Sequence, residues 1–427
     1  MKQLIGFIAT VLFLLFSADS LSQTQSDSSE ALMKSAPKIF VDCTDCDLDY
    51  IRTQVAFTNY VRDRLEAQIH ILITSQTTGS GGKEYTLVFI GQHEFQGMND
   101  TLRFATTKSA TEDDIRKEFV RTLKLGLVRY TAKTPLAEYI SVSFKEPSQP
   151  AAVKDTWNYW VFSLSLHGYI NGQKSQTFRT VSGSISADRV TADVKISLST
   201  NAFYNESNFT IGDQKVVSIS RGQGFYAMSV WSLSEHWSIG GFASAYTSTY
   251  QNVKFSPRVA PAIEYDVFPY SASTLKQLTF LYRLNYEHYW YYEETIYDKL
   301  EQALPGESLS LTLILKQPWG SVSTALAGAH YFYDFRRNNL TLSGSMTLKL
   351  FEGLSVSLGG FVSMIHDQLS LPKRGATPEE ILLQRRQLET GYRYFSFVGV
   401  TYTFGSIYNN IVNPRFNTQA GSFSVSF

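Results

Sequence analysis

The carboxy-terminal part of the chain alternates apolar and polar residues at every second position. Leu340–Leu350 keeps this pattern over eleven residues, and Leu354–Met364 repeats it. A period of two is typical of β-strands with one apolar and one polar face. We therefore expect about twelve antiparallel strands, near 156–169, 176–188, 191–204, 215–233, 236–250, 254–267, 275–291, 307–317, 320–334, 338–350, 353–367 and 390–404.

The preceding part of the chain mixes helical and strand patterns. Ile51, Val55 and Tyr60 are spaced as on one face of a helix, and the acidic residues of 111–114 are typical of a helix start. A glycine-rich turn at 78–83 joins two apolar runs. The pattern predicts a compact α+β domain at 37–145 and a proline-containing linker at 146–154. Its expected elements are strands at 38–41, 67–75, 84–89 and 138–144, and helices at 48–64 and 111–131.

The first residues have the pattern of an export signal. A short positive start, Met1–Gln3, precedes an apolar run from Leu4 to Phe16 that is too short to cross a membrane as a helix. Small and polar residues follow it. We expect a secretory signal peptide at 1–22, then a flexible polar amino terminus at 23–36.

Three features favour a membrane location for the strand-rich region. Several segments have the roughly nine to eleven residues that a tilted strand needs to cross a bilayer. Tight turns such as Phe351–Gly353 alternate with longer polar connections such as Glu293–Glu307 and Leu371–Leu388. Aromatic residues gather near strand ends, as in Tyr289–Tyr292, where interfacial rings are favoured. A soluble antiparallel sandwich or barrel is the alternative, because its strands also alternate.

With these features, region 155–404 resembles Gram-negative outer-membrane β-barrel proteins. Such barrels usually end in Phe with apolar residues at alternate preceding positions, a signal for the barrel-assembly machinery. That pattern is present at Val398, Val400, Tyr402 and Phe404, and a second one ends at Phe427. We place the last strand at Phe404 and a tail at 405–427.

This resemblance implies a location and partners. It places a transmembrane barrel of about twelve strands in the cell outer membrane, with the amino-terminal domain and the tail in the periplasm. The expected partners are outer-membrane lipid, the assembly machinery and, as an option, another periplasmic or envelope protein.

Charged residues of both signs fall on the face expected to point inward. They suit either a charged pore lining or a lumen closed by ion pairs. The candidates are Asp193, Lys195, Arg258, Glu264, Asp266, Arg283, Glu287, Lys349 and Arg393. Lys plus Arg equal Asp plus Glu at 38 each, so net charge gives no support for nucleic-acid binding. We expect a non-enzymatic envelope protein with an interaction or gating domain, or alternatively a porin-like channel for small solutes.

Catalytic and cofactor motifs are weak. The sequence from His236 through Ser238 to Gly240 resembles the His-x-Ser-Asn-Gly motif of outer-membrane phospholipases, but it lacks the Asn. It also falls at an expected periplasmic turn, whereas that family acts at the outer leaflet. Lipid hydrolysis is therefore the least favoured alternative, and we assign no catalytic residue. Neither Gly79–Lys83 nor His93–Glu94 completes a phosphate-binding or zinc motif, so no cofactor or metal is expected.

The two cysteines, Cys43 and Cys46, form a Cys-x-x-Cys pair. In an oxidising compartment this spacing fits a structural disulfide, a reactive dithiol or half of a metal site. Asp42 and Asp45 beside them would raise the pKa of a thiol and disfavour its thiolate. We therefore favour the disulfide.

Overall fold

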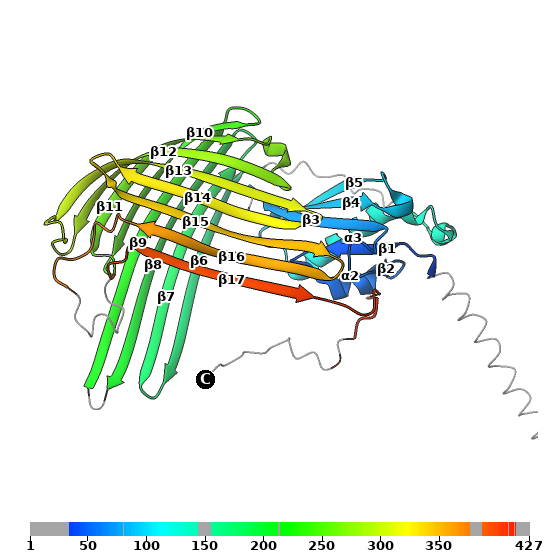
Figure 1. The fold of residues 1–427 in the computed structure, drawn as a ribbon, viewed down its shortest axis with the longest axis horizontal. Coiled ribbons are helices and arrows are strands. Elements are labelled where there is room, and N and C mark those ends of the chain that lie inside the picture. The colour runs from blue at the N-terminus through cyan, green and yellow to red at the C-terminus, as the bar shows by residue number, and fades with distance from the viewer. Residues whose placement is uncertain are drawn as a thin grey trace, which may run out of the picture.

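The computed structural model describes residues 34–79, 81–143, 155–211, 214–375, 387–408, 410–413 and 415. Within them the chain is mainly β, with a small α+β region followed by a large antiparallel sheet (Figure 1). The expected signal peptide, the linker at 146–154 and the last part of the tail, 416–427, lie outside the described residues. Among the described residues, no helix combines the length and the apolar run needed to span a membrane.

The α+β region is a five-stranded sheet in the order β2-β1-β3-β4-β5. β2 and β3 run parallel to β1, and the other neighbours are antiparallel. Its elements are β1 (Lys38–Asp42), α2 (Leu48–Gln54), β2 (Asn59–Tyr60), β3 (Ile69–Thr77), β4 (Lys83–Gly91), η1 (His93–Phe95), β5 (Asp100–Thr106), α3 (Glu112–Thr131) and η2 (Pro135–Tyr139).

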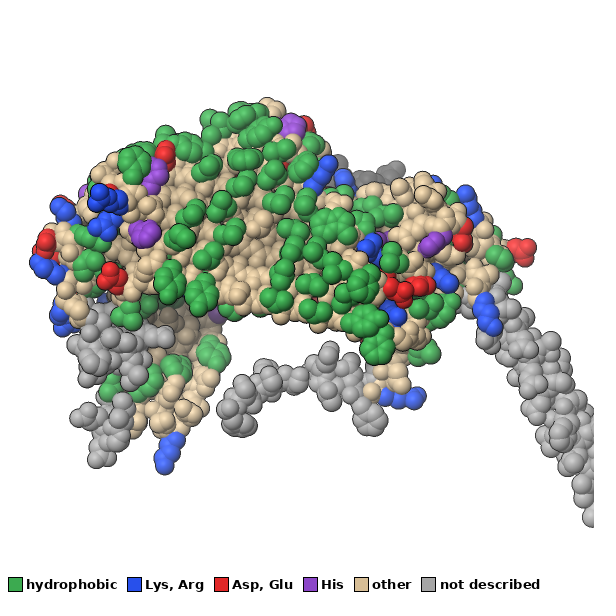
Figure 2. Space-filling view, viewed as in Figure 1, with side chains coloured by type: hydrophobic (Ala, Val, Ile, Leu, Met, Phe, Trp, Pro, Cys, Tyr) green, Lys and Arg blue, Asp and Glu red, His purple; other side chains and the backbone are tan. Residues whose placement is uncertain are grey.

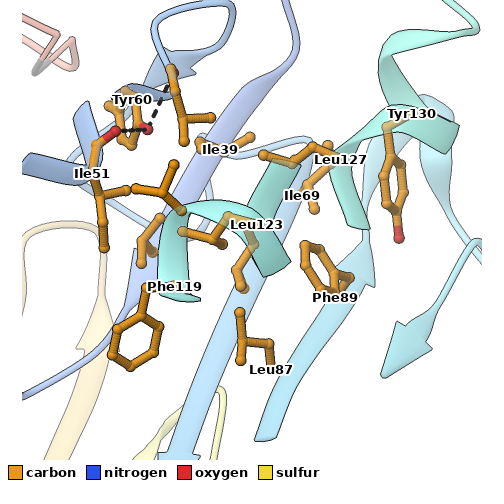
Figure 3. Packing of buried hydrophobic residues seen from close by; sticks show 14 of the residues in the cluster. Ile39, Ile51, Tyr60, Ile69, Leu87, Phe89, Phe119, Leu123, Leu127 and Tyr130 are labelled. Carbon is orange, nitrogen blue, oxygen red and sulfur yellow. Dashed lines mark hydrogen bonds between the residues drawn. The ribbon is translucent and has the colours of Figure 1, made fainter. Parts of the chain in front are cut away.

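Helix α3 packs its apolar side on this sheet. Phe119, Leu123 and Leu127 are buried against Leu87 and Phe89 of β4 (Figure 3). The helix starts with a capping box, in which the Thr111 hydroxyl accepts from the Asp114 amide and the Asp114 carboxylate accepts from the Thr111 amide. The expected helix at 111–131 is thus confirmed.

The expected helix at 48–64 is too long. α2 ends at Gln54, and Asn59–Tyr60 instead pair with Lys38 and Ile39 of β1. Figure 3 shows the reason, because the buried Tyr60 hydroxyl turns back and donates to the carbonyls of Ile51 and Val55 at the end of α2.

One further expectation in this region is wrong, and one strand was missed. The closing strand expected at 138–144 is absent over its described part, where a 3-10 turn ends at Tyr139 and residues 140–143 have no regular structure. The fifth strand of the sheet is β5, which the sequence analysis left out.

The large sheet has twelve strands, each antiparallel to the next, as predicted. They are β6 (Trp160–Gln173), β7 (Gln176–Val190), β8 (Val194–Ile211), β9 (Gln214–Ser232), β10 (Trp237–Ser248), β11 (Val253–Asp266), β12 (Lys276–Tyr291), β13 (Glu301–Gln317), β14 (Gly320–Tyr331), β15 (Asp334–Phe351), β16 (Leu354–Ile365) and β17 (Tyr392–Tyr402), with the short turn η3 (Tyr270–Ala272) between β11 and β12.

The strand register gives this sheet one apolar and one polar face, because directly paired residues in antiparallel strands point to the same side. One row of pairs, on the apolar face, runs across Leu309, Gly328, Leu340, Met364 and Tyr392. A second row, on the polar face, runs across Lys316, Ser321, Thr347, Ser357 and Gly399.

The polar face is the concave one. Tyr246 of β10, Asn339 of β15 and Arg393 of β17 line a single cavity although four strands lie between β10 and β15, and six between β10 and β17. Only the inside of a curled sheet brings such distant strands together. Figure 2 shows the outer side, with hydrophobic side chains spread over the middle and charged ones gathered toward the ends.

The curled sheet is not a closed ring. β6 and β17 are its edges, and no pairing joins them in the described residues. Side chains are exposed along both edges, as the 80% exposed Leu164 of β6 and the 55% exposed Phe395 of β17 illustrate. The fold is therefore barrel-like, with the predicted strand number but without the closure that the barrel prediction required.

Candidate functional site

The α+β region meets the large sheet at the end that carries the β13–β14 and β15–β16 turns. Figure 1 places it beside the ends of β13 to β17. We call this contact the junction, and its central residues are Asp42, Asp63, His70, Lys349 and Gly353.

An ion pair at the end of β1 forms the centre of the junction. Lys349 Nζ of β15 lies 2.6 Å from Asp42 Oδ2, and the same oxygen is 3.2 Å from Nε2 of His70. The His70 side chain is fully buried, and those of Asp42 and Lys349 are about three-quarters buried. Lys349 also lies 4.8 Å from the ring centroid of Phe40. One carboxylate thus holds together a strand of each sheet.

The surroundings of Asp42 favour its charged form. Burial alone would raise its pKa, but the hydrogen bond with His70 and the charge and hydrogen bond of Lys349 outweigh burial and hold the pKa below its usual value. Because an ionised carboxylate only accepts hydrogen bonds, His70 donates through Nε2. Its Nδ1 has no partner among the described residues, so the imidazole depends on Asp42 for its single hydrogen bond.

The β15–β16 turn makes the second contact. The Gly353 amide donates to Asp63 Oδ2 at 2.7 Å, and Arg62 lies 3.6 Å from Glu352. Gly353 has a φ of 73°, and a Cβ there would lie 2.0 Å from the Thr403 carbonyl oxygen. A residue with a side chain would therefore strain the turn that presents this amide.

The segment that follows β17 makes the third contact. Tyr408 forms an antiparallel bridge with Val61, and the Arg62 amide donates to the Ile407 carbonyl at 2.9 Å. The Tyr60 amide donates to Asn410 Oδ1 at 2.6 Å. This part of the predicted tail extends the edge of the small sheet next to β2.

The α+β region also touches the opposite part of the large sheet. Lys108 Nζ donates to the Ser163 hydroxyl on β6, and Gly79 is packed against Val190 at the end of β7. Contacts to β6 on one side and to the segment after β17 on the other mean that the region lies across one end of the concave face.

A cavity of about 360 Å³ remains between the two parts. Its lining includes Asp42, Asp45, Tyr85, Lys316 and Lys349, so both signs of charge face it. The arrangement keeps polar groups of the concave face in contact with the α+β region through hydrogen bonds and charges rather than through an apolar core.

The charged residues predicted to point inward have two kinds of position. Asp193 lies in the turn between β7 and β8. The others lie on strands and point to the polar, concave face: Lys195, Arg258, Glu264, Asp266, Arg283, Glu287, Lys349 and Arg393. Among the described residues, only Lys349 of this set forms an ion pair. That they line a lumen stays a prediction.

His236 and Ser238 have separate partners. His236 Nδ1 lies 2.7 Å from the Asp266 carbonyl oxygen, and the Ser238 hydroxyl donates to Tyr270 Oη at 3.0 Å. Tyr270 in turn donates to Glu264. These contacts do not form the hydrogen-bonded Ser-His pair that activates a serine nucleophile.

Cys43 and Cys46 are disulfide-bonded in the loop between β1 and α2. This loop borders the junction cavity. In the part of the chain that the structure describes, no group of three or more His, Cys, Asp or Glu side chains is placed to share a metal ion.

Of the central junction residues, the sequence analysis singled out only Lys349, as a lumen-lining candidate, and it did not predict the junction itself. Asp42 directly follows a predicted strand, and His70 interrupts an apolar run, which is the one local sign that a buried polar partner exists. Neither position shows which residue it pairs with, because Lys349 lies 307 residues from Asp42.

The candidate assembly signal, Val398, Val400, Tyr402 and Phe404, coincides with β17 and the residues just after it. Val398, Val400 and Tyr402 point to the apolar face. Comparisons with known proteins add no function: no known protein family matches the chain, and no curated protein is significantly similar to it.

Proposed function

We propose that this chain is an outer-membrane protein whose large sheet spans the bilayer, and whose α+β region gates the polar interior from the periplasm. The outward rows of apolar side chains support the membrane location. The strands of 11 to 19 residues reach or exceed the roughly nine to eleven residues needed to cross a bilayer at a tilt. The outer surface carries its charged side chains toward its ends (Figure 2).

The single observation that carries the gating role is the ion pair between Asp42 and Lys349. It connects the α+β region to a residue of the polar face itself. The remaining contacts are also polar, and a polar interface separates more readily than an apolar core. A gate requires two states close in free energy, and such a junction allows them.

Electrophoresis without boiling tests the membrane sheet. Membrane barrels migrate faster when unboiled, so we expect a heat-dependent shift for the full chain extracted from outer membranes. A single unshifted band, or recovery of the chain in the soluble fraction, would contradict the membrane part of the proposal.

Conductance in planar bilayers tests the gate. We expect the wild type to be closed for most of the time, and Lys349→Met and Asp42→Asn to open more often, because each breaks the ion pair. Exchange of the two residues, Asp42→Lys with Lys349→Asp, should restore part of the closure. Lys195→Met is the matched control, since Lys195 lies on the same face but outside the junction.

An unregulated diffusion pore is the second candidate, favoured by the serine-rich concave face. Ser163, Ser323 and Ser345 belong to that face on widely separated strands. Steady conductance of the wild type, unchanged in the Lys349→Met variant, would support the pore and contradict the gate.

A further inference from the structure

A second cavity lies at the end of the concave face opposite the junction. Its volume is about 350 Å³, toward the small end of the usual range for ligand pockets. The wall supplies Tyr246, Tyr289, Asn339 and Arg393. Asn339 of the cavity wall is near the start of β15, whereas Lys349 of the junction is near the end of the same strand. The two sites therefore lie at opposite ends of the concave face.

The cavity has a roof made by residues 366–371, which directly follow β16. Within this segment Leu369 and Leu371 are 5% exposed. The Ile296 amide donates to the Leu371 carbonyl at 2.8 Å, and Asn252 Nδ2 donates to the Ser370 carbonyl at 3.0 Å. The segment thus reaches the β10–β11 and β12–β13 connections, and it supplies Asp367 and Gln368 to the cavity. Buried and hydrogen-bonded residues therefore enclose the cavity.

Most of the polar lining is neutral. It consists of side-chain amides, each with a donor and an acceptor, and of hydroxyl groups, which can donate or accept. These groups belong to Tyr246, Gln251, Tyr289, Asn339, Gln368, Ser370, Gln387 and Thr390. One carboxyl, Asp367, and one guanidinium, Arg393, complete the lining, so the site carries no excess of either charge.

Asp367 and Arg393 do not pair with each other. Within the described residues neither forms an ion pair: the Asp367 carboxyl accepts from Asn339 Nδ2 at 3.4 Å, and Arg393 lies 5.2 Å from the Phe361 ring centroid. Each therefore has hydrogen-bonding capacity left for a ligand. The two tyrosines lie with their hydroxyls 3.5 Å apart and offer aromatic surface beside these polar groups.

We propose that this cavity binds a neutral saccharide of one or two sugar units. Each sugar hydroxyl both donates and accepts, which matches a dense mixture of amide, hydroxyl, carboxyl and guanidinium groups. The C–H faces of a sugar ring pack on aromatic rings, and a ligand without net charge matches a lining in which one positive and one negative group balance. The site depends only on the curled sheet and its roof, not on the gating role proposed above.

Saturation-transfer NMR on the full-length protein in detergent tests this site, with glucose and maltose as probes. We expect transfer to the ring protons of at least one of them, with binding about tenfold weaker in Arg393→Gln and in Asp367→Asn, because each removes a charged hydrogen-bonding group. The matched controls are Arg179→Gln, on β7, and Asp334→Asn, at the first residue of β15 at the same end of the sheet; both should bind as the wild type does.

Three results would overturn the proposal. In the first, the wild type shows no saturation transfer to either sugar. In the second, the control variants lose as much sugar binding as Arg393→Gln and Asp367→Asn do. In the third, transfer is seen to a zwitterionic amino acid such as alanine and not to the sugars. A circular dichroism spectrum of each variant guards against misfolding, because Arg393→Gln and Asp367→Asn should keep the spectrum of the wild type if the fold is intact. None of these results depends on conductance, so the saccharide site and the gate fail separately.

Discussion

At the scale of single residues, Asp42 is the carboxylate that joins the two sheets. It is a mostly buried carboxylate that belongs to one sheet and is neutralised by a lysine of the other. A charge of this kind is costly to bury unless it is paired and hydrogen-bonded. Loss of Lys349 would leave Asp42 with His70 alone, and we expect docking of the two parts to weaken by about 2 kcal/mol.

The lowered pKa of Asp42 also makes the junction sensitive to acid. A carboxyl whose pKa is lower in the folded state contributes stability that is present above its unfolded pKa of 3.8 and is lost as the pH falls through the folded value. We therefore expect the junction to loosen below about pH 4. Hydrogen exchange of peptides that cover residues 38–46 and 346–354, corrected for intrinsic rates, measures this loosening.

Two variants separate Asp42 from the other acids. Asp42→Asn should remove most of the change in protection between about pH 6 and pH 3. Asp113→Asn is the control, because the pKa of Asp113 is also lowered, by Lys117 and Arg116 on the exposed side of α3 away from the junction. Equal acid sensitivity of the Asp42→Asn variant and the wild type would show that another group controls docking.

At the scale of elements, the packing of α3 on the small sheet depends on a glycine. A Cβ at Gly126 would lie 2.2 Å from Cζ of Phe89, so the ring lies directly on the helix backbone. We expect Gly126→Ala to destabilise the α+β region by about 1 to 3 kcal/mol through overpacking. This cost exceeds the roughly 1 kcal/mol that alanine gains in helix propensity.

Hydrogen exchange of residues 112–131 in the full chain measures this loss. Leu125→Ala provides the control on the same helix, since Leu125 is 63% exposed and its side chain contributes little to the core. The packing argument is wrong if Gly126→Ala protects the helix as well as, or better than, the wild type does.

The elements that the sequence predicts correctly are those whose pattern is repeated over many residues. Each long strand of the large sheet shows its two faces in its own sequence, so twelve strands and their polar face follow from a period of two. α3 has a capping box and four turns of apolar spacing. Short elements lack such a signal. β2 has two residues, and it exists because β1 lies beside it and Tyr60 closes the end of α2.

The two candidate sites were not predictable for a related reason. Asp42 with Lys349, and Tyr246 with Arg393, are brought together by the curl of the sheet and the docking of the α+β region. Alternation identifies which side chains point inward, but it does not give the distance across the concave face. The roof over the second cavity was predicted only as a polar connection, because its order comes from contacts with two other loops.

At the scale of the whole molecule, the open seam between β6 and β17 is the feature that most needs explanation. An unpaired strand edge exposes a row of amides and carbonyls, and in hydrocarbon each unsatisfied group costs several kcal/mol. Along both edge strands, the side chains alternate between the apolar face and the concave face. Leu164 on β6 and Val398 on β17 point to the apolar face, whereas Ser165 and Phe397 point to the concave one.

In the proposed membrane location, we therefore expect the two edges to pair with each other. β6 runs away from the junction and β17 runs toward it, so their pairing would be antiparallel like every other pair in the sheet. Cysteine pairs test this pairing in outer membranes, with Ser165→Cys combined in turn with Phe395→Cys, Phe397→Cys and Gly399→Cys. On mild oxidation, at least one pair should form an intramolecular disulfide, because directly opposed residues in antiparallel strands bring their Cβ atoms within about 5.5 Å.

The matched control replaces Ser165 with its neighbour. Leu164→Cys combined with the same three positions should cross-link far less, since its side chain points to the opposite face. A disulfide that joins two copies of the chain would indicate that each edge pairs with a second molecule, and the absence of any cross-link would indicate that the seam stays open in the bilayer. Either outcome contradicts closure, and in the second the open seam would give the concave face a lateral route to the lipid rather than a sealed wall.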